Sequence, residues 1–211
     1  VEDGTSADRS PLWGDPVVAL TFEGGIVNGG SLQAALGYRG VETAEGGRFG
    51  SAARFSGGAC VWVPEVPITE EGTWCAWLRV DAEQAEPDVR IMDGNGYAFG
   101  ISRARIYSQF HTDKMKILRG DNVPVGEWTH VAMTWQQGYV KLYFNGYVHD
   151  QGLYEGRPAE ARKKVVIGAR WTEKDKPFDG CLDDVCIFDR ALRAEDIRTL
   201  MEAGLASGRE S

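Results

Sequence analysis

The sequence lacks any apolar run that approaches the roughly 20 residues needed for a membrane-spanning helix. It also lacks a basic excess, because Lys plus Arg number 23 against 31 for Asp plus Glu, which gives a net charge of −8. Nucleic acids and anionic membranes both bind basic surfaces. We therefore expect neither a membrane span nor a nucleic-acid partner.

Motifs for catalysis and for zinc binding are also missing. Histidine occurs three times, at His111, His130 and His149, and the chain contains no CxxC, no HExxH and no phosphate-binding loop. Glycoside hydrolases use two carboxylates that reach one glycosidic bond, and no strand of this chain carries such a spacing. We therefore predict no catalytic residue.

The four cysteines are Cys60, Cys75, Cys181 and Cys186, and each falls in a predicted strand. Two disulfides are compatible with this number, in any of three connectivities. A free thiol that is buried as a small apolar side chain is an equally good interpretation of each. Both interpretations stay open at this point.

Glycine, by contrast, is abundant: 27 of the 211 residues, where about 7% is usual. These glycines separate short runs in which apolar residues alternate with polar or small ones, as in half-buried strands. The clearest example is residues 126–146, where two such runs flank Gln137-Gly138, a hairpin signal. The alternating apolar residues of the two runs are Val131, Met133, Trp135, Val140, Leu142 and Phe144.

The same pattern predicts further strands at 17–22, 52–55, 59–63, 72–80, 90–92, 97–101, 105–110, 148–154, 165–167 and 181–188. Residues 23–50 are Gly-rich and show no firm pattern, and 111–125 indicate a loop with at most a short strand near Ile117. Ile197, Leu200 and Met201 follow a helical spacing that ends at Gly204, so we expect one short helix over 194–203. Many short strands with glycine turns favour an antiparallel sandwich.

Six stretches resemble, in order, the laminin G-like family of concanavalin A-like jelly rolls. They are RFGSAARFSGG, GTWCAWLRV, GEWTHVAMTW, VKLYFNG, VVIGA and FDGCLDDVCIFDRALRAEDIRTL. The resemblance spans about residues 17–204 and implies an all-β, antiparallel two-sheet jelly-roll sandwich with one short C-terminal helix. We expect a flexible leader at 1–15, a single domain at 16–205 and a flexible tail at 206–211.

The resemblance also implies structural calcium between the first and last strands. Calcium prefers carboxylate and carbonyl oxygens, and the matching positions hold Glu23 and Asp183. Asp183 and Asp184 should point to opposite faces, so at most one of them is expected to face inward. The alternative is a hydrogen-bonded aspartate at a strand end.

Lyases of this fold use Arg, Gln, His and Tyr on one face of a sheet. Arg105, Tyr107, Gln109 and His111 alternate on one predicted strand, so all four would face the same way. The simpler explanation is an ordinary polar outer face of a strand.

Saccharides are commonly held by aromatic faces together with a few polar groups. Trp171 stands out because it lies in a charged loop with no core pattern, although it can also fold back as a lid on the sandwich edge. Phe110 is a further aromatic candidate. The predicted ligand-binding residues are Asp93, Asn95, Tyr97, Arg105, Tyr107, His111 and Trp171.

From these features we predict a non-catalytic, lectin-like carbohydrate-recognition module of a secreted or cell-surface protein. The chain begins at Val1 rather than Met, which is typical of a mature or trimmed product, so the missing signal peptide is uninformative. The alternatives are a protein-interaction or structural spacer domain and a polysaccharide lyase or glycoside hydrolase.

Overall fold

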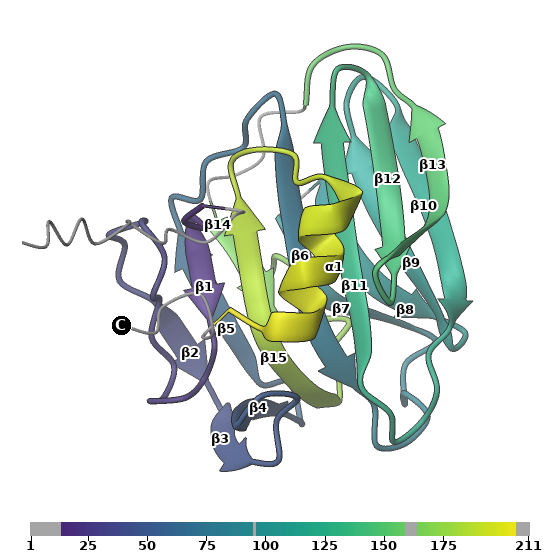
Figure 1. Ribbon diagram of the computed structural model, residues 1–211. Coiled ribbons are helices and arrows are strands. Elements are labelled where there is room, and N and C mark those ends of the chain that lie inside the picture. The colour runs from purple at the N-terminus through teal and green to yellow at the C-terminus, as the bar shows by residue number, and fades with distance from the viewer. Residues whose placement is uncertain (1–13, 95, 159–163, 206–211) are drawn as a thin grey trace, which may run out of the picture.

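The computed structural model describes residues 14–94, 96–158 and 164–205, and these residues form two antiparallel sheets that face each other (Figure 1). The eight-stranded sheet contains β1 (Val18–Leu20), β3 (Glu42–Glu45), β4 (Ser51–Phe55), β6 (Gly72–Arg79), β11 (Thr129–Gln136), β12 (Tyr139–Phe144), β13 (Tyr147–Leu153) and β15 (Gly180–Phe188). The seven-stranded sheet contains β2 (Gly37–Arg39), β5 (Cys60–Pro64), β7 (Asp88–Asp93), β8 (Tyr97–Ser102), β9 (Arg105–His111), β10 (Met115–Asn122) and β14 (Lys164–Ile167). The predicted all-β sandwich is confirmed.

The order of strands brings segments that are distant in sequence side by side. The larger sheet runs β13-β12-β11-β6-β15-β4-β3, with β1 also paired to β15, and the smaller runs β10-β9-β8-β7-β14-β5-β2. The edge strands β13 and β10 lie at the same end of the two sheets, beside each other. The hairpin predicted around Gln137-Gly138 joins β11 and β12.

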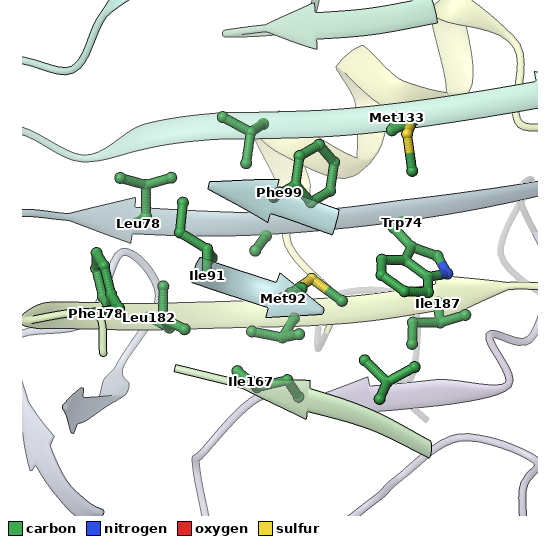
Figure 2. Packing of buried hydrophobic residues seen from close by; sticks show 14 of the residues in the cluster. Trp74, Leu78, Ile91, Met92, Phe99, Met133, Ile167, Phe178, Leu182 and Ile187 are labelled. Carbon is green, nitrogen blue, oxygen red and sulfur yellow. The ribbon is translucent and has the colours of Figure 1, made fainter. Parts of the chain in front are cut away.

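The main core fills the space between the sheets. Alternate residues of β11, namely Val131, Met133 and Trp135, point into it, as the sequence pattern predicted. Each large apolar side chain that is fully buried contributes about 1.5–3 kcal/mol. Figure 2 shows side chains from both sheets that meet in this layer, among them Trp74, Leu78, Ile91, Met92, Phe99, Met133, Ile167, Phe178, Leu182 and Ile187.

A second, smaller core lies on the outer face of the eight-stranded sheet, which is the face turned away from the other sheet. Helix α1 (Ala194–Ala203) covers this face (Figure 1) and buries Ile197 and Leu200 against it. The Arg193 amide donates to the Asp196 Oδ2 atom at 3.2 Å, which satisfies one of the free amides at the start of the helix. The predicted helix is confirmed.

Both interpretations of the cysteines occur in the structure: two of them form a disulfide and the other two are free thiols. Cys75 of β6 and Cys186 of β15 are register partners and form a disulfide within the second core. It joins residues 111 positions apart, and in the chain-entropy account a loop of about 100 residues gains about 4–5 kcal/mol from such a bond. Cys60 and Cys181 are buried free thiols.

Three strands differ from the sequence prediction. β2 and β3 lie in the Gly-rich region where no structure was predicted, and β10 spans eight residues where only a short strand was expected. Every residue of β3 is exposed, and β10 is an edge strand that buries only Leu118 and Gly120, so neither shows an apolar alternation.

The ends of the chain lie mostly outside the described residues. Residues 1–13 of the predicted leader and the whole predicted tail, 206–211, belong to this part. Within the described residues, no helix has both the length and the apolar character to cross a membrane.

His130 of β11 is fully buried, with its ring against that of Trp77 at a centroid distance of 5.2 Å. Burial lowers the pKa of this imidazole from its usual 6.5 to about 3, because the charged form loses its hydration. Between these values the unfolded chain binds a proton that the folded chain does not. The part of the folding stability that depends on a neutral His130 is therefore fully present above about pH 6.5 and is lost as the pH falls towards 3.

We predict that His130→Gln removes this pH dependence. The free energy of unfolding of the natural chain, minus that of the variant, should fall by about 1.4 kcal/mol for each pH unit below 6.5. Urea denaturation between pH 4 and pH 8 measures both curves, and subtraction cancels the titration of carboxylates elsewhere. Parallel curves for the two proteins would show that the His130 pKa is not depressed.

Candidate functional site

The predicted lyase-like residues lie on β9 and share the outer face of the seven-stranded sheet. Ile106 and Phe110 belong to the main core, so the alternate residues point outward. These are Arg105, Tyr107, Gln109 and His111.

At the middle of this face, Arg90 of β7 is buried in a network of polar groups. Its Nε lies 3.1 Å from the Asp93 Oδ2 atom as an ion pair, and its Nη2 donates to the Gln109 Oε1 atom at 3.3 Å. Its guanidinium carbon lies 5.2 Å from the centroid of the Tyr107 ring, a distance typical of a cation–π contact. Arg90 thereby holds two predicted ligand residues, Asp93 and Tyr107, in fixed positions.

The Tyr107 hydroxyl crosses β8 to donate to the Asp88 Oδ1 atom on β7, at 2.6 Å. It can do so because Gly100 lies beneath it, where an added Cβ would be 2.5 Å from the hydroxyl oxygen. Lys176 pairs with the other oxygen of Asp88. The centre of this face is thus a partly buried polar layer in which Tyr107, Asp88 and Lys176 bind one another, while the Arg90 Nη1 atom has no hydrogen-bond partner among the described residues.

The remaining predicted ligand residues do not gather around this layer. Arg105 and His111 are exposed at opposite ends of β9, about 20 Å apart along the strand, and Arg105 donates to the Gly120 carbonyl at 3.1 Å. Trp171 is half-buried in the loop between β14 and β15. Asn95 lies outside the described residues.

Tyr97 is fully buried in the main core, where its ring lies 5.6 Å from that of Trp135 and 5.1 Å from that of Phe110. Neither Tyr97 nor Phe110 is open to a ligand on the outer face. Both positions follow the core alternation of their strands, so their selection as candidates rested on residue type alone.

The predicted calcium ligands Glu23 and Asp183 both reach the loop between β3 and β4. The Glu23 Oε1 atom accepts from the Ser51 amide at 2.9 Å, and the Asp183 Oδ2 atom accepts from the Phe49 amide at 3.0 Å. An added Cβ on Gly50 would lie 2.4 Å from the Glu23 Oε1 atom, so the loop closes tightly on this carboxylate. The two predicted ligands are brought to one loop.

The expectation that Asp183 and Asp184 alternate between opposite faces fails, because Leu182 and Val185 on either side of them both belong to the main core. A register shift between Asp183 and Cys186 breaks the alternation, and Asp184 has a φ of 44°. Both carboxyl groups are buried. The Asp184 Oδ2 atom accepts from the Leu205 amide at 2.8 Å. Burial raises the pKa of Asp183 to about 6 and that of Asp184 to about 7, and repulsion from Glu23 adds to both shifts.

A hollow of about 240 Å³ lies on the outer face of the eight-stranded sheet, over β11, β12 and β13. We call it the first hollow, and its lining consists of Thr134, Gln136, Gln137, Tyr139, Lys141 and Gln151. The Tyr139 side chain is 52% exposed. Within the described part of the chain, the side-chain amides of the three glutamines have no hydrogen-bond partner.

The sequence carried signals for both the first hollow and the polar layer. Gln136, Tyr139 and Lys141 occupy the outward positions of the predicted hairpin, between its core residues. Arg90 is the one charged residue of the predicted strand 90–92, beside Ile91 and Met92, which points to a paired or ligand-bound residue. The sequence does not indicate that Gln151 of β13 lies beside the hairpin residues of the first hollow, or that Gln109 of β9 lies beside Arg90.

Comparison with known proteins agrees with this architecture. Residues 55–198 match the family model described as the concanavalin A-like lectin/glucanases superfamily. No curated protein sequence matches the chain.

Several solved structures share the fold. The receptor binding domain of botulinum neurotoxin C/D mosaic serotype has a TM-score of 0.76 and 18% identity, over 90% of this chain and 51% of that chain. The binding domain of Paraclostridial Mosquitocidal Protein 1 has a TM-score of 0.74 and 18% identity, over 89% and 52%. The botulinum neurotoxin serotype D ligand binding domain in complex with N-acetylneuraminic acid has a TM-score of 0.73 and 18% identity, over 90% and 51%. The chain thus spans about half the length of these structures.

We predict that Asp93→Asn lowers the free energy of unfolding by about 3 kcal/mol, because it removes the nearer carboxylate and leaves buried Arg90 with only that of Asp88, at 4.0 Å. Urea denaturation measures the change. Asp121→Asn on β10 is the matched control, since Asp121 is exposed and its side chain accepts only from the amide of the next residue. Unchanged stability together with weaker ligand binding would instead make Asp93 a ligand contact.

Proposed function

The chain belongs to the concanavalin A-like lectin/glucanase superfamily, and from this premise we propose that it is a non-catalytic module that recognises carbohydrate. The proposed site is the first hollow. It is preferred to the predicted face of β9 because Arg90 already engages Tyr107 and Gln109 there. Ligand roles for His111 and Trp171 remain predictions.

The observation that carries the proposal is the combination of an exposed aromatic ring with unpaired amides in one small hollow. A sugar ring has an apolar face that can stack on Tyr139 and hydroxyls that both donate and accept hydrogen bonds. Gln136, Gln137 and Gln151 supply donors and acceptors in matching numbers. The volume, about 240 Å³, lies below the roughly 300 Å³ at which pockets for drug-sized ligands begin, and so suits a single sugar unit.

Gln137 adds support because its backbone is strained. Its φ is 47°, in the left-handed region where glycine or asparagine is usual, and residues held there cost about 1–3 kcal/mol. Such strain collects at functional sites. A glutamine at this position extends its amide over the hollow, which a glycine would not do.

The lining also favours recognition over cleavage. Hydrolysis of a glycosidic bond uses a pair of carboxylates, and the lining of the first hollow consists of amides, hydroxyls and one lysine. The similar structures are described as receptor-binding or ligand-binding domains, and one of them is a complex with N-acetylneuraminic acid. This likeness supports a binding module.

We further propose that the protein is secreted or displayed at the cell surface. The Cys75–Cys186 disulfide supports this location, because disulfides persist in oxidising compartments and are rare in the cytosol.

We also propose a structural calcium ion at Glu23 and Asp183. Both carboxylates keep acceptor capacity beyond the amides that they bind, and the tight approach of Gly50 to Glu23 forms a cradle. Among the described residues no group of three acidic, cysteine or histidine side chains could hold a metal, so backbone carbonyls and water would complete the six to eight oxygens that calcium takes. Calcium would offset the repulsion between these carboxylates and hold the β3–β4 loop to β15.

We predict that saccharide binding depends on Tyr139. Glycan-array screening followed by calorimetry on the best ligand should give an affinity that Tyr139→Ser lowers by at least about tenfold, equal to about 1.4 kcal/mol. Chromatography should recover the saccharide intact.

The matched control is Tyr147→Ser, because Tyr147, the first residue of β13, is 68% exposed but does not line the first hollow. It should bind as the natural chain does. Absence of binding to every saccharide, or cleavage of the bound one, would overturn the proposed function.

We predict that calcium raises the melting temperature relative to EDTA. At about 100 times its dissociation constant, calcium adds about 2.7 kcal/mol, which is about 5–10 °C for a chain of this size. Glu23→Gln should remove most of this shift, whereas Glu42→Gln on the exposed strand β3 should keep it. Equal melting temperatures in calcium and EDTA would count against the calcium site.

A further inference from the structure

A second hollow of about 370 Å³ lies next to the first, at the edge of the sandwich. Its lining comes from the β9–β10 turn with the start of β10 and from the end of β13: Thr112, Asp113, Lys114, Met115, Lys116, Leu153, Tyr154 and Glu155. β10 and β13 belong to different sheets but lie beside each other (Figure 1).

The two hollows adjoin across β13. Leu153, which lines the second hollow, is the register partner of Tyr139, which lines the first, so their Cα atoms are about 5 Å apart. Gln151, in the first hollow, lies two residues before Leu153 on the same face, at about 7 Å. The Tyr154 amide donates to the Gly138 carbonyl at 2.8 Å, which fixes the end of β13 to the β11–β12 turn.

Exposed apolar side chains mark the path from one hollow to the other. Leu153 is 63% exposed and Met115 is 54% exposed, and both line the second hollow, while Tyr139 lines the first. Single exposed apolar residues are ordinary, but three that line two adjoining hollows indicate a binding surface. Such side chains suit the apolar faces of successive sugar rings.

The charges of the second hollow are balanced. Lys114 and Lys116 line the hollow together with Asp113 and Glu155, and none of the four forms an ion pair with any described residue. Lys116 is also positioned by Gly152, where an added Cβ would lie 2.2 Å from the lysine Cε atom. Ammonium donors and carboxylate acceptors in equal number match hydroxyl groups, which both donate and accept, so the second hollow selects for neither net charge; Lys141 of the first hollow is the one lining charge beyond this balance.

We propose that the ligand is a neutral oligosaccharide of at least two sugar units that crosses β13. One unit occupies the first hollow against Tyr139, and the next occupies the second hollow against Leu153 and Met115. This inference rests on the proposed function, since it extends the same site.

The test compares chain lengths of one sugar. Calorimetry with glucose and its β-1,4-linked oligomers, and with N-acetylglucosamine and its β-1,4-linked oligomers, should show affinity that rises at least about tenfold from the monomer to the trimer. Leu153→Ser should remove this rise and leave the affinity for the monomer unchanged. Val148→Ser, a matched change at a 42% exposed position of β13 outside both hollows, should keep the rise.

The outcomes separate the two proposals. Equal affinity for monomer and oligomers, or a rise that survives Leu153→Ser, would overturn the extended site while the recognition function stands. Failure of every member of both series to bind, together with absence of binding to every saccharide on the glycan array, would overturn both. Stronger binding of sulfated or carboxylated oligomers than of neutral ones would overturn the assignment of a neutral ligand.

Discussion

Burial of both faces of β6 and β15 is the constraint on which the rest of the structure depends. Along β6, Trp74, Ala76 and Leu78 point into the main core, while Cys75 points to the layer beneath α1. Neither strand can lose its neighbours on either side without exposing apolar surface to water. The second sheet and the helix are therefore held by the same pair of strands, and the disulfide joins these two strands.

The two sheets use their outer faces differently. The outer face of the seven-stranded sheet is filled at its middle by Arg90 and the side chains that contact it. The eight-stranded sheet is covered by α1 over one part and left open over β11, β12 and β13. The open part carries glutamine amides that bind no described residue, so it offers hydrogen-bonding capacity to a ligand.

Alternation predicted the fold well where a strand has one clearly buried face, as in β11 and β12. It failed at β2 and β3, which bury almost nothing, and at Asp184, where a bulge inserts an extra residue. It also would have placed Tyr97 in the core, had spacing been weighed above residue type. The site was harder to predict, because the hollows and the polar layer contain residues of several strands, and the local sequence pattern does not determine the order in which strands pair.

The Cys75–Cys186 bond also turns the intervening segment into a closed covalent ring. Both hollows, which span residues 112–155, lie inside this ring. A protease that cuts the backbone once anywhere between the two cysteines therefore opens the ring without releasing a fragment. The two pieces of the nicked molecule therefore stay covalently joined until a reductant breaks the disulfide.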